Sequence, residues 1–194
     1  MVANLARAWS ARFIEPIARF LGSLGLTPNA VTVLGFFLTV AVAGVLATGR
    51  LFLAGILLSV TLAFDAVDGT LARMLGQTSR FGAFLDSTLD RWAEVVMFVA
   101  ISWIYVQADD DLGMMLSIVA LSMSLLVSYT RARAEGVGLQ CKEGIFTRFE
   151  RLVILIAGLL LGQLTWALAI IAVLAGITAV QRILVTWRAS QSHP

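Results

Sequence analysis

The chain has 194 residues, of which 59% are hydrophobic and only 13% are charged, and its mean hydropathy is +0.91. A soluble domain of this length needs a far more polar surface, so the composition excludes a soluble globular protein. Apolar runs of about 20 residues recur, which is the length that crosses the hydrocarbon core of a membrane as a helix. The sequence therefore predicts an all-α integral membrane protein with a single domain over residues 1–194. The lone cysteine, Cys141, excludes an intrachain disulfide.

The first 25 residues have the pattern of an amphipathic helix. Large apolar side chains recur at helical spacing from Leu5 to Leu24, with arginines between them. This pattern is typical of a helix that lies in the headgroup region of a membrane. We therefore expect residues 1–25 to form an N-terminal interfacial helix beside the membrane, kinked or restarted at Pro16.

Six apolar segments follow and predict a bundle of six transmembrane helices over residues 26–188. Thr27 and Pro28 suit the cap and the first turn of the first helix. A polar connection over residues 136–147 precedes the fifth helix. The six predicted helices cover residues 29–48, 51–74, 82–107, 112–135, 148–163 and 165–187.

The basic residues predict how the bundle is oriented. Six spans put both termini on one side of the membrane, and 13 of the 14 basic residues then fall on that side, with only Arg50 opposite. Such an excess marks the cytoplasmic side. The three consecutive aspartates, Asp109 to Asp111, fall on the other side, which agrees. We expect a multi-pass protein of the cell membrane with both termini in the cytoplasm.

Four carboxylates lie within the otherwise apolar second and third segments. Asp65 and Asp68 are three residues apart, and Asp86 and Asp90 are four apart. On helices, both spacings place the paired side chains on one face, and the turn-like residues 76–80 between them allow two antiparallel helices to meet at a common point. Four carboxylates this close cannot all stay ionised without a cation. Oxygen ligands with no nearby histidine or cysteine favour Mg²⁺ or Mn²⁺ over zinc.

The spacing of this stretch, D-x2-D-G-x2-A-R-x8-G-x3-D-x3-D, resembles the signature of the CDP-alcohol phosphotransferase family. The fixed positions are all present: Asp65, Asp68, Gly69, Ala72, Arg73, Gly82, Asp86 and Asp90. The spacing alone indicates a divalent-metal site that handles phosphate. The alternative is that the acids form salt bridges inside a helical bundle and have only a structural role. Intramembrane carboxylates are costly and usually functional, which favours the site.

The resemblance implies a role for each of these residues. Two metal ions would clamp the diphosphate of a CDP-linked lipid. The implied metal ligands are Asp65, Asp68, Asp86 and Asp90, and Asp90 is also the implied general base that activates the acceptor hydroxyl. Small residues leave room for a nucleotide, and Arg73 offers a forked donor to phosphate. The expected contacts to the CDP-lipid are Asn29, Thr32, Asp68, Gly69, Ala72, Arg73, Arg80 and Gly82.

A second group of basic residues indicates where the acceptor binds. Arg131 and Arg133 end the fourth predicted helix, Arg151 opens the fifth, and Arg182 lies in the apolar sixth. Any one of them alone is compatible with a headgroup-facing arginine. Several arginines beside an acidic metal site fit a phosphorylated acceptor. The expected contacts to the acceptor phosphate are Ser128, Arg131, Arg133, Arg151 and Arg182.

Four further segments are similar to one branch of the family, the phosphatidylinositol-phosphate synthases of actinobacteria. These segments are residues 27–32, 128–135, 148–151 and 180–182. The similarity covers most of the chain and implies CDP-diacylglycerol as donor, inositol 1-phosphate as acceptor, and a phosphatidylinositol phosphate and CMP as products. It also implies a homodimer, with membrane lipids around it and no nucleic-acid partner.

Two other functions remain open at this point. A sister enzyme, phosphatidylglycerol-phosphate synthase, would use glycerol 3-phosphate and differ only in the acceptor pocket. A cation transporter would also use intramembrane carboxylates. Broken helices or internal repeats near the membrane midplane would favour the transporter, and the sequence shows neither.

Overall fold

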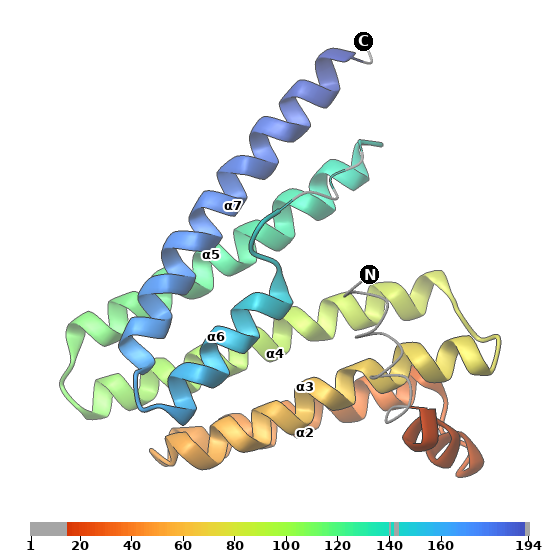
Figure 1. The fold of residues 1–194 in the computed structure, drawn as a ribbon, viewed down its shortest axis with the longest axis horizontal. Helices are drawn as coiled ribbons and strands as arrows, with labels where there is room; N and C mark the ends of the chain where they lie inside the picture. Colours follow the sequence, from red (N-terminus) through yellow and green to blue (C-terminus); the bar gives the residue numbers. More distant parts are fainter. Residues whose placement is uncertain (1–14, 140, 142–143, 193–194) are drawn as a thin grey trace. The chain divides into compact units, whose positions relative to one another are not determined.

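The structure is a computed structural model that describes residues 15–139, 141 and 144–192, and the regular secondary structure of these residues is all α-helix. A short helix over residues 15–23 comes first. Six longer helices follow (Figure 1): α2 (Pro28–Ala47), α3 (Leu51–Met74), α4 (Arg80–Gln107), α5 (Asp111–Gly136), α6 (Arg148–Leu160) and α7 (Leu164–Ser192).

These six helices agree with the six predicted segments to within a few residues at most boundaries. Four of them, α2, α3, α5 and α7, are long and apolar enough to cross a membrane. The first half of α4 carries several charges, and α6 has 13 residues, or about 20 Å of helix. The all-α membrane fold is therefore confirmed, whereas six spans stay a prediction. Residues 1–14 of the predicted interfacial helix lie outside the described residues.

The described residues form two compact units. The first unit contains residues 15–44 and 56–97, and the second contains residues 45–55 and the described residues from 98 onward. The helices α2, α3 and α4 contribute residues to both units. The prediction of one domain stays a prediction.

The first unit has a small apolar core that packs α2 against α3. Buried Val31 from α2 meets Val67 and Leu71 from α3, together with Ala18 from the preceding helix. Partly buried apolar side chains surround them: Leu21, Leu26 and Phe64. This packing places the beginning of α2 beside the last turns of α3, where two of the four aspartates lie.

A tight turn reverses the chain between α3 and α4. Gly76 has a φ of 63°, in the left-handed region that favours glycine at the end of a helix. The Gln77 amide donates to the Ala72 carbonyl at 2.9 Å. Ser79 then caps α4, because its hydroxyl accepts a hydrogen bond from the Gly82 amide at 2.9 Å. The turn therefore brings the acidic ends of both helices to the same end of the unit.

In the second unit, α7 packs along α5 and α6 (Figure 1). A Cβ added at Gly158 of α6 would lie 2.4 Å from the Cβ of Ala167 in α7, so the two backbones are close. The Ser102 and Ser117 hydroxyls are 2.6 Å apart, and those of Tyr105 and Thr165 are 2.8 Å apart. Small residues and hydrogen bonds between helices are the contacts that hold bundles together in lipid.

Candidate functional site

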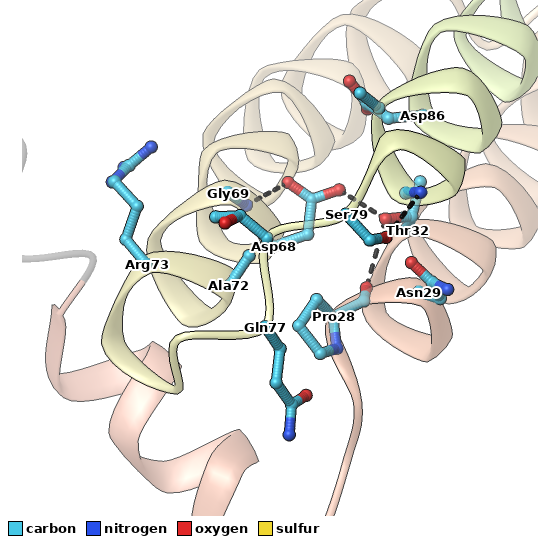
Figure 2. A pocket seen from close by; sticks show the side chains of 13 residues that line it. Pro28, Asn29, Thr32, Asp68, Gly69, Ala72, Arg73, Gln77, Ser79 and Asp86 are labelled. Atoms are coloured by element: carbon cyan, nitrogen blue, oxygen red, sulfur yellow. Dashed lines mark hydrogen bonds between the residues drawn. The ribbon is translucent and has the colours of Figure 1, made fainter.

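A cavity of about 200 Å³ lies in the first unit among the beginning of α2, the end of α3 and the beginning of α4 (Figure 2). Seven of the eight predicted CDP-lipid contacts line it: Asn29, Thr32, Asp68, Gly69, Ala72, Arg73 and Gly82. The eighth, Arg80, is exposed and is not part of the lining. The structure therefore gathers most of the predicted donor site into one space.

Asp68 is held in place by two hydrogen bonds. Its Oδ2 accepts a hydrogen bond from the Thr32 hydroxyl of α2 at 2.7 Å, and its Oδ1 accepts one from the Gly69 amide at 2.5 Å. Figure 2 shows the Asp68 carboxylate between these two donors. The Thr32 hydroxyl also lies 3.1 Å from the Pro28 carbonyl of its own helix. Thus α2 orients a carboxylate that belongs to α3.

The four motif aspartates are all half-buried, but they do not all reach the cavity. Asp68 and Asp86 line it, whereas Asp65 and Asp90 lie about one turn farther along their helices and do not. An oxygen of Asp65 lies 3.5 Å from the position that a Cβ on Gly35 would take, so this carboxylate faces α2. Asp90 Oδ2 lies 3.5 Å from Arg91 Nη1.

In the part of the chain that the structure describes, no three acidic, histidine or cysteine side chains come close enough to share a metal ion. The four-carboxylate metal site therefore stays a prediction. The chemistry of the donor set still fits Mg²⁺ or Mn²⁺, because Asp68 and Asp86 present carboxylate oxygens to one cavity from two helices. The neighbouring Thr32 adds a hydroxyl on the same wall.

Small residues keep the cavity open. A Cβ on Gly82 would lie 3.0 Å from the Ser79 hydroxyl oxygen and 3.1 Å from Asn29 Oδ1, so a side chain there would crowd both. Arg73 donates from Nη2 to the Thr70 hydroxyl at 3.1 Å, and Figure 2 shows it directed away from Asp68. In this arrangement Arg73 stands at the rim of the cavity.

Five lining residues were missed by the sequence reasoning: Pro28, Gln77, Thr78, Ser79 and Ala83. Three of them belong to the turn between α3 and α4, in the eight-residue gap of the motif. The motif fixes positions on the helices and leaves the gap open, so it gives no signal for these side chains. The turn signal around Gly76 was the available clue, because a turn that joins two site helices must border the site.

The predicted acceptor residues lie in the second unit and differ in burial. Arg151 and Arg182 are buried, with 3% and 4% of their surface exposed, whereas Arg131 and Arg133 are exposed and Ser128 is half-buried. Arg182 Nη1 donates to the Val127 carbonyl at 2.5 Å. The structure therefore anchors one arginine of α7 to the backbone of α5.

Three of the predicted arginines are close enough to interact electrostatically, and the fourth, Arg133, lines a separate cavity. Arg131 and Arg151 lie within electrostatic range of Arg182, as does Glu135. Arg131 also pairs with Glu135 at 2.8 Å. Arg133 instead lines a cavity of about 340 Å³ between the ends of α5 and α7, which Arg182 borders too. Ser128, Arg131 and Arg151 do not line that cavity, so the five predicted residues do not share it.

Comparison with known proteins identifies the family. The model of the CDP-alcohol phosphatidyltransferase family matches residues 25–180. The chain belongs to this family. The family predicted from the acidic stretch is thus confirmed, and membership of an enzyme family decides against the cation transporter.

The chain is similar to several named members along nearly its whole length. It is 38% identical over 211 residues to the phosphatidylinositol phosphate synthase of Streptomyces avermitilis, covering 98% of this chain and 84% of that protein. It is 36% identical over 191 residues to the archaetidylinositol phosphate synthase of Methanothermobacter thermautotrophicus, covering 95% and 94%.

Solved structures agree with the fold. The Mycobacterium tuberculosis phosphatidylinositol phosphate synthase with CDP-DAG bound matches with a TM-score of 0.85 and 35% identity, covering 91% of this chain and 94% of that one. The same enzyme in complex with manganese and citrate matches with a TM-score of 0.85 and 35% identity, covering 90% and 88%.

The hydrogen bond between Thr32 and Asp68 makes a testable prediction. Thr32→Val should weaken Mn²⁺ binding to the purified protein by roughly 10–100-fold, the usual effect of losing a hydrogen bond to a metal ligand. Thr32→Ser should retain the hydroxyl and most of the affinity. The measurement is a Mn²⁺ titration followed by electron paramagnetic resonance.

Thr39→Val is the matched control for this prediction. Thr39 lies on the same helix, is buried, and bonds to the Gly35 carbonyl at 3.1 Å in the same local pattern. The Thr39→Val variant should have an unchanged Mn²⁺ affinity. An unchanged affinity in Thr32→Val would show that this bond does not support a metal ligand.

Proposed function

We propose that this protein transfers the phosphatidyl group of CDP-diacylglycerol to inositol 1-phosphate, forming phosphatidylinositol phosphate and CMP. The observation that carries the proposal is the cavity in the first unit, which joins the residues of the family motif beside Asp68 and Asp86. The two named relatives support the acceptor, because inositol phosphate is common to both names. The CDP-DAG bound to the mycobacterial enzyme supports the donor.

A divalent cation is part of this proposal. Mg²⁺ or Mn²⁺, as a pair of ions, would be held by Asp65, Asp68, Asp86 and Asp90. The manganese complex of the mycobacterial enzyme supports this assignment. When bound, the ions would offset the charge of the carboxylates and of the donor diphosphate and polarise the phosphoryl oxygens.

The side chains of the first unit account for donor binding and proton transfer. Gly69, Ala72 and Gly82 let the nucleotide approach the helices closely, and Arg73 at the rim binds phosphate oxygens. The acceptor hydroxyl oxygen bonds to the phosphorus next to diacylglycerol, and the bond from that phosphorus to CMP breaks. Asp90 takes the proton of the attacking hydroxyl as general base.

The arginines of the second unit account for acceptor binding. The exposed Arg131 and the buried Arg151 are like charges within electrostatic range of the buried Arg182, and a bound phosphate dianion would offset this repulsion. Ser128 adds a hydroxyl on the same helix as Arg131. Arg133 contributes from the cavity that it shares with Arg182.

We also propose six membrane spans, an interfacial N-terminal helix and a homodimer in the cell membrane. Both termini and the acidic ends of α3 and α4 face the cytoplasm. The distribution of basic residues supports this orientation, with 13 on the side of the termini and Arg50 opposite. Exposed aromatic and aliphatic side chains, such as Trp103, Trp166 and Val173, suit a lipid-facing surface.

An acceptor panel tests the function directly. Purified protein with labelled CDP-diacylglycerol and Mg²⁺ should release CMP with inositol 1-phosphate, and much less with free inositol, because free inositol leaves the arginine charges uncompensated. Excess EDTA should abolish release, and Mg²⁺ or Mn²⁺ should restore it. A clear preference for glycerol 3-phosphate would identify the sister enzyme, and full activity in EDTA would refute the metal site.

Asp90→Asn tests the general base. The amide keeps the shape of the carboxylate but cannot take the proton, so kcat should fall by roughly 10²–10⁴. The KM for CDP-diacylglycerol should change little. Asp111→Asn, at the exposed beginning of α5, is the control and should leave kcat unchanged. Near wild-type turnover by Asp90→Asn would mean that another group accepts the proton.

Cysteine labelling tests the orientation. In a Cys141→Ser background, Gln163→Cys in the exposed turn before α7 should react with an impermeant maleimide on intact cells. Ser190→Cys near the C-terminus should react only after the cells are permeabilised. The reverse pattern would contradict a cytoplasmic active site, and labelling of both positions from one side would contradict six spans.

A further inference from the structure

The cavity of about 340 Å³ in the second unit lies between the last turns of α5 and the C-terminal part of α7. Both helices are long and apolar enough to cross a membrane, and they pack side by side (Figure 1). The charged residues of α5 after its apolar stretch, such as Arg133, lie at this end. The cavity is therefore at the level where a spanning helix meets the lipid headgroups.

Most of the cavity wall is apolar. Ala134 and Val137 of α5 and Ile183 of α7 line it, together with the ring of Tyr129. The last three of these side chains, Val137, Ile183 and Tyr129, are exposed at the surface of the unit. A wall of this kind favours contact with a hydrocarbon chain over contact with a small anion that is polar on all sides.

Three hydrogen-bond donors of the same wall have no hydrogen-bond partner among the described residues. They are the Arg133 guanidinium and the hydroxyls of Thr186 and Tyr129. A threonine inside a helix commonly donates to the carbonyl four residues earlier, and Thr130, which also lines the cavity, does so at 2.9 Å. Thr186 makes no such bond within the described part of the chain, so its hydroxyl can donate to a ligand.

The charge of the cavity favours an anion. Among the described residues that line it, none is acidic, and the nearby Glu135 pairs with Arg131 at 2.8 Å. Arg182 also borders the cavity, but its Nη1 donates to the Val127 carbonyl. A zwitterionic headgroup would bring a positive charge that no carboxylate of the wall could pair. An anionic headgroup would bring only the negative charge that complements Arg133.

We propose that this cavity binds an anionic phospholipid of the surrounding membrane. The lipid phosphate accepts hydrogen bonds from Arg133, Thr186 and Tyr129, and an acyl chain lies along Val137 and Ile183. Basic pockets between membrane helices recognise phosphate headgroups in this way. The inference goes beyond the proposed function, which uses Arg133 only as one of several arginines, and the binding of the lipid requires neither CDP-diacylglycerol nor an acceptor.

Lipid binding to the purified full chain in detergent tests the proposal, with native mass spectrometry as the measurement. The protein is titrated separately with phosphatidylglycerol, phosphatidylcholine and inorganic phosphate. Wild-type protein should bind phosphatidylglycerol most tightly. Arg133→Gln should lower the affinity for phosphatidylglycerol by roughly 10–150-fold, the range for one lost charge-assisted hydrogen bond.

Arg188→Gln is the matched control for charge. Arg188 is exposed near the end of α7 and does not line the cavity. This variant removes the same charge as Arg133→Gln and should keep the wild-type affinity for phosphatidylglycerol. An equal loss of affinity in both variants would indicate general attraction to a basic surface, and it would overturn the proposal.

Two threonines of the cavity give a test that leaves the charge of the protein intact. Thr186→Val removes a hydroxyl assigned to the lipid and should lower the affinity for phosphatidylglycerol by roughly 2–10-fold, the range for one lost neutral hydrogen bond. Thr130→Val should leave the affinity unchanged, because the Thr130 hydroxyl already donates to the Leu126 carbonyl. Equal affinities of the two variants would contradict a phosphate bound at Thr186.

Other occupants of the cavity would give different results. Phosphatidylcholine bound as tightly as phosphatidylglycerol would refute recognition of an anionic headgroup, and inorganic phosphate bound as tightly would refute recognition of a lipid. A dimer that dissociates in Arg133→Gln while lipid binding is unchanged would assign the cavity to a second copy of the chain.

The failure of this inference is distinct from failure of the proposed function. The lipid titrations contain no acceptor, so their outcome does not depend on whether the protein uses inositol 1-phosphate. Active wild-type protein with the same phosphatidylglycerol affinity as Arg133→Gln would refute only the lipid site.

Discussion

Repulsion among carboxylates inside apolar helices is the constraint on which the rest of this structure depends. Two unit charges 4 Å apart interact by about 4 kcal/mol at an effective dielectric constant of 20. In the proposed function, hydrogen bonds and a divalent cation would offset the charges of Asp65 and Asp68 on α3 and of Asp86 and Asp90 on α4. Thr32 and the Gly69 amide supply hydrogen bonds to Asp68. The tight turn at Gly76 keeps the acidic ends of both helices in the same unit.

In the second unit, the repulsion is between positive charges. Arg151 and Arg182 are buried, and Arg131 lies within electrostatic range of Arg182. The Val127 carbonyl and Glu135 offset part of this positive charge. A phosphate dianion has the charge and geometry to offset more of it. In the proposed function, the first unit would bind the donor diphosphate through cations, and the second would bind the acceptor phosphate through arginines.

Much of the fold could be predicted from the sequence, because helices of a membrane protein are long, continuous runs of apolar residues. Long apolar runs ended by turn residues located the helices closely. The acidic motif contains five of the seven predicted donor residues that line the cavity, and the other two, Asn29 and Thr32, belong to the segment 27–32. Arg80, which lies in the eight-residue gap of the motif, was also expected there, but it lies at the exposed beginning of α4 and does not line the cavity. Arg131 and Arg133 were grouped by closeness in sequence. Residues two apart on a helix point in different directions. Arg133 therefore lines the cavity of about 340 Å³ between the ends of α5 and α7, and Arg131 does not.

Other features could not be predicted from the fixed positions of the motif. The turn residues from Gln77 to Ser79 occupy the gap of the motif, and the hydrogen bond from Arg182 to the Val127 carbonyl joins α7 to α5. Such contacts depend on how the helices pack, which local patterns do not report. The short α6 shows the same limit, because 13 residues form a helix without establishing that it spans a membrane.

The most direct test of the central claim is anomalous diffraction at the manganese edge from crystals of the protein grown with Mn²⁺. The account predicts a manganese peak that is coordinated by carboxylates from both α3 and α4, with Asp68 and Asp86 among its ligands. The same crystals of Asp86→Asn should show a weakened or lost peak. Manganese bound elsewhere, with no peak between these carboxylates in active protein, would contradict the claim that a cation joins the two helices.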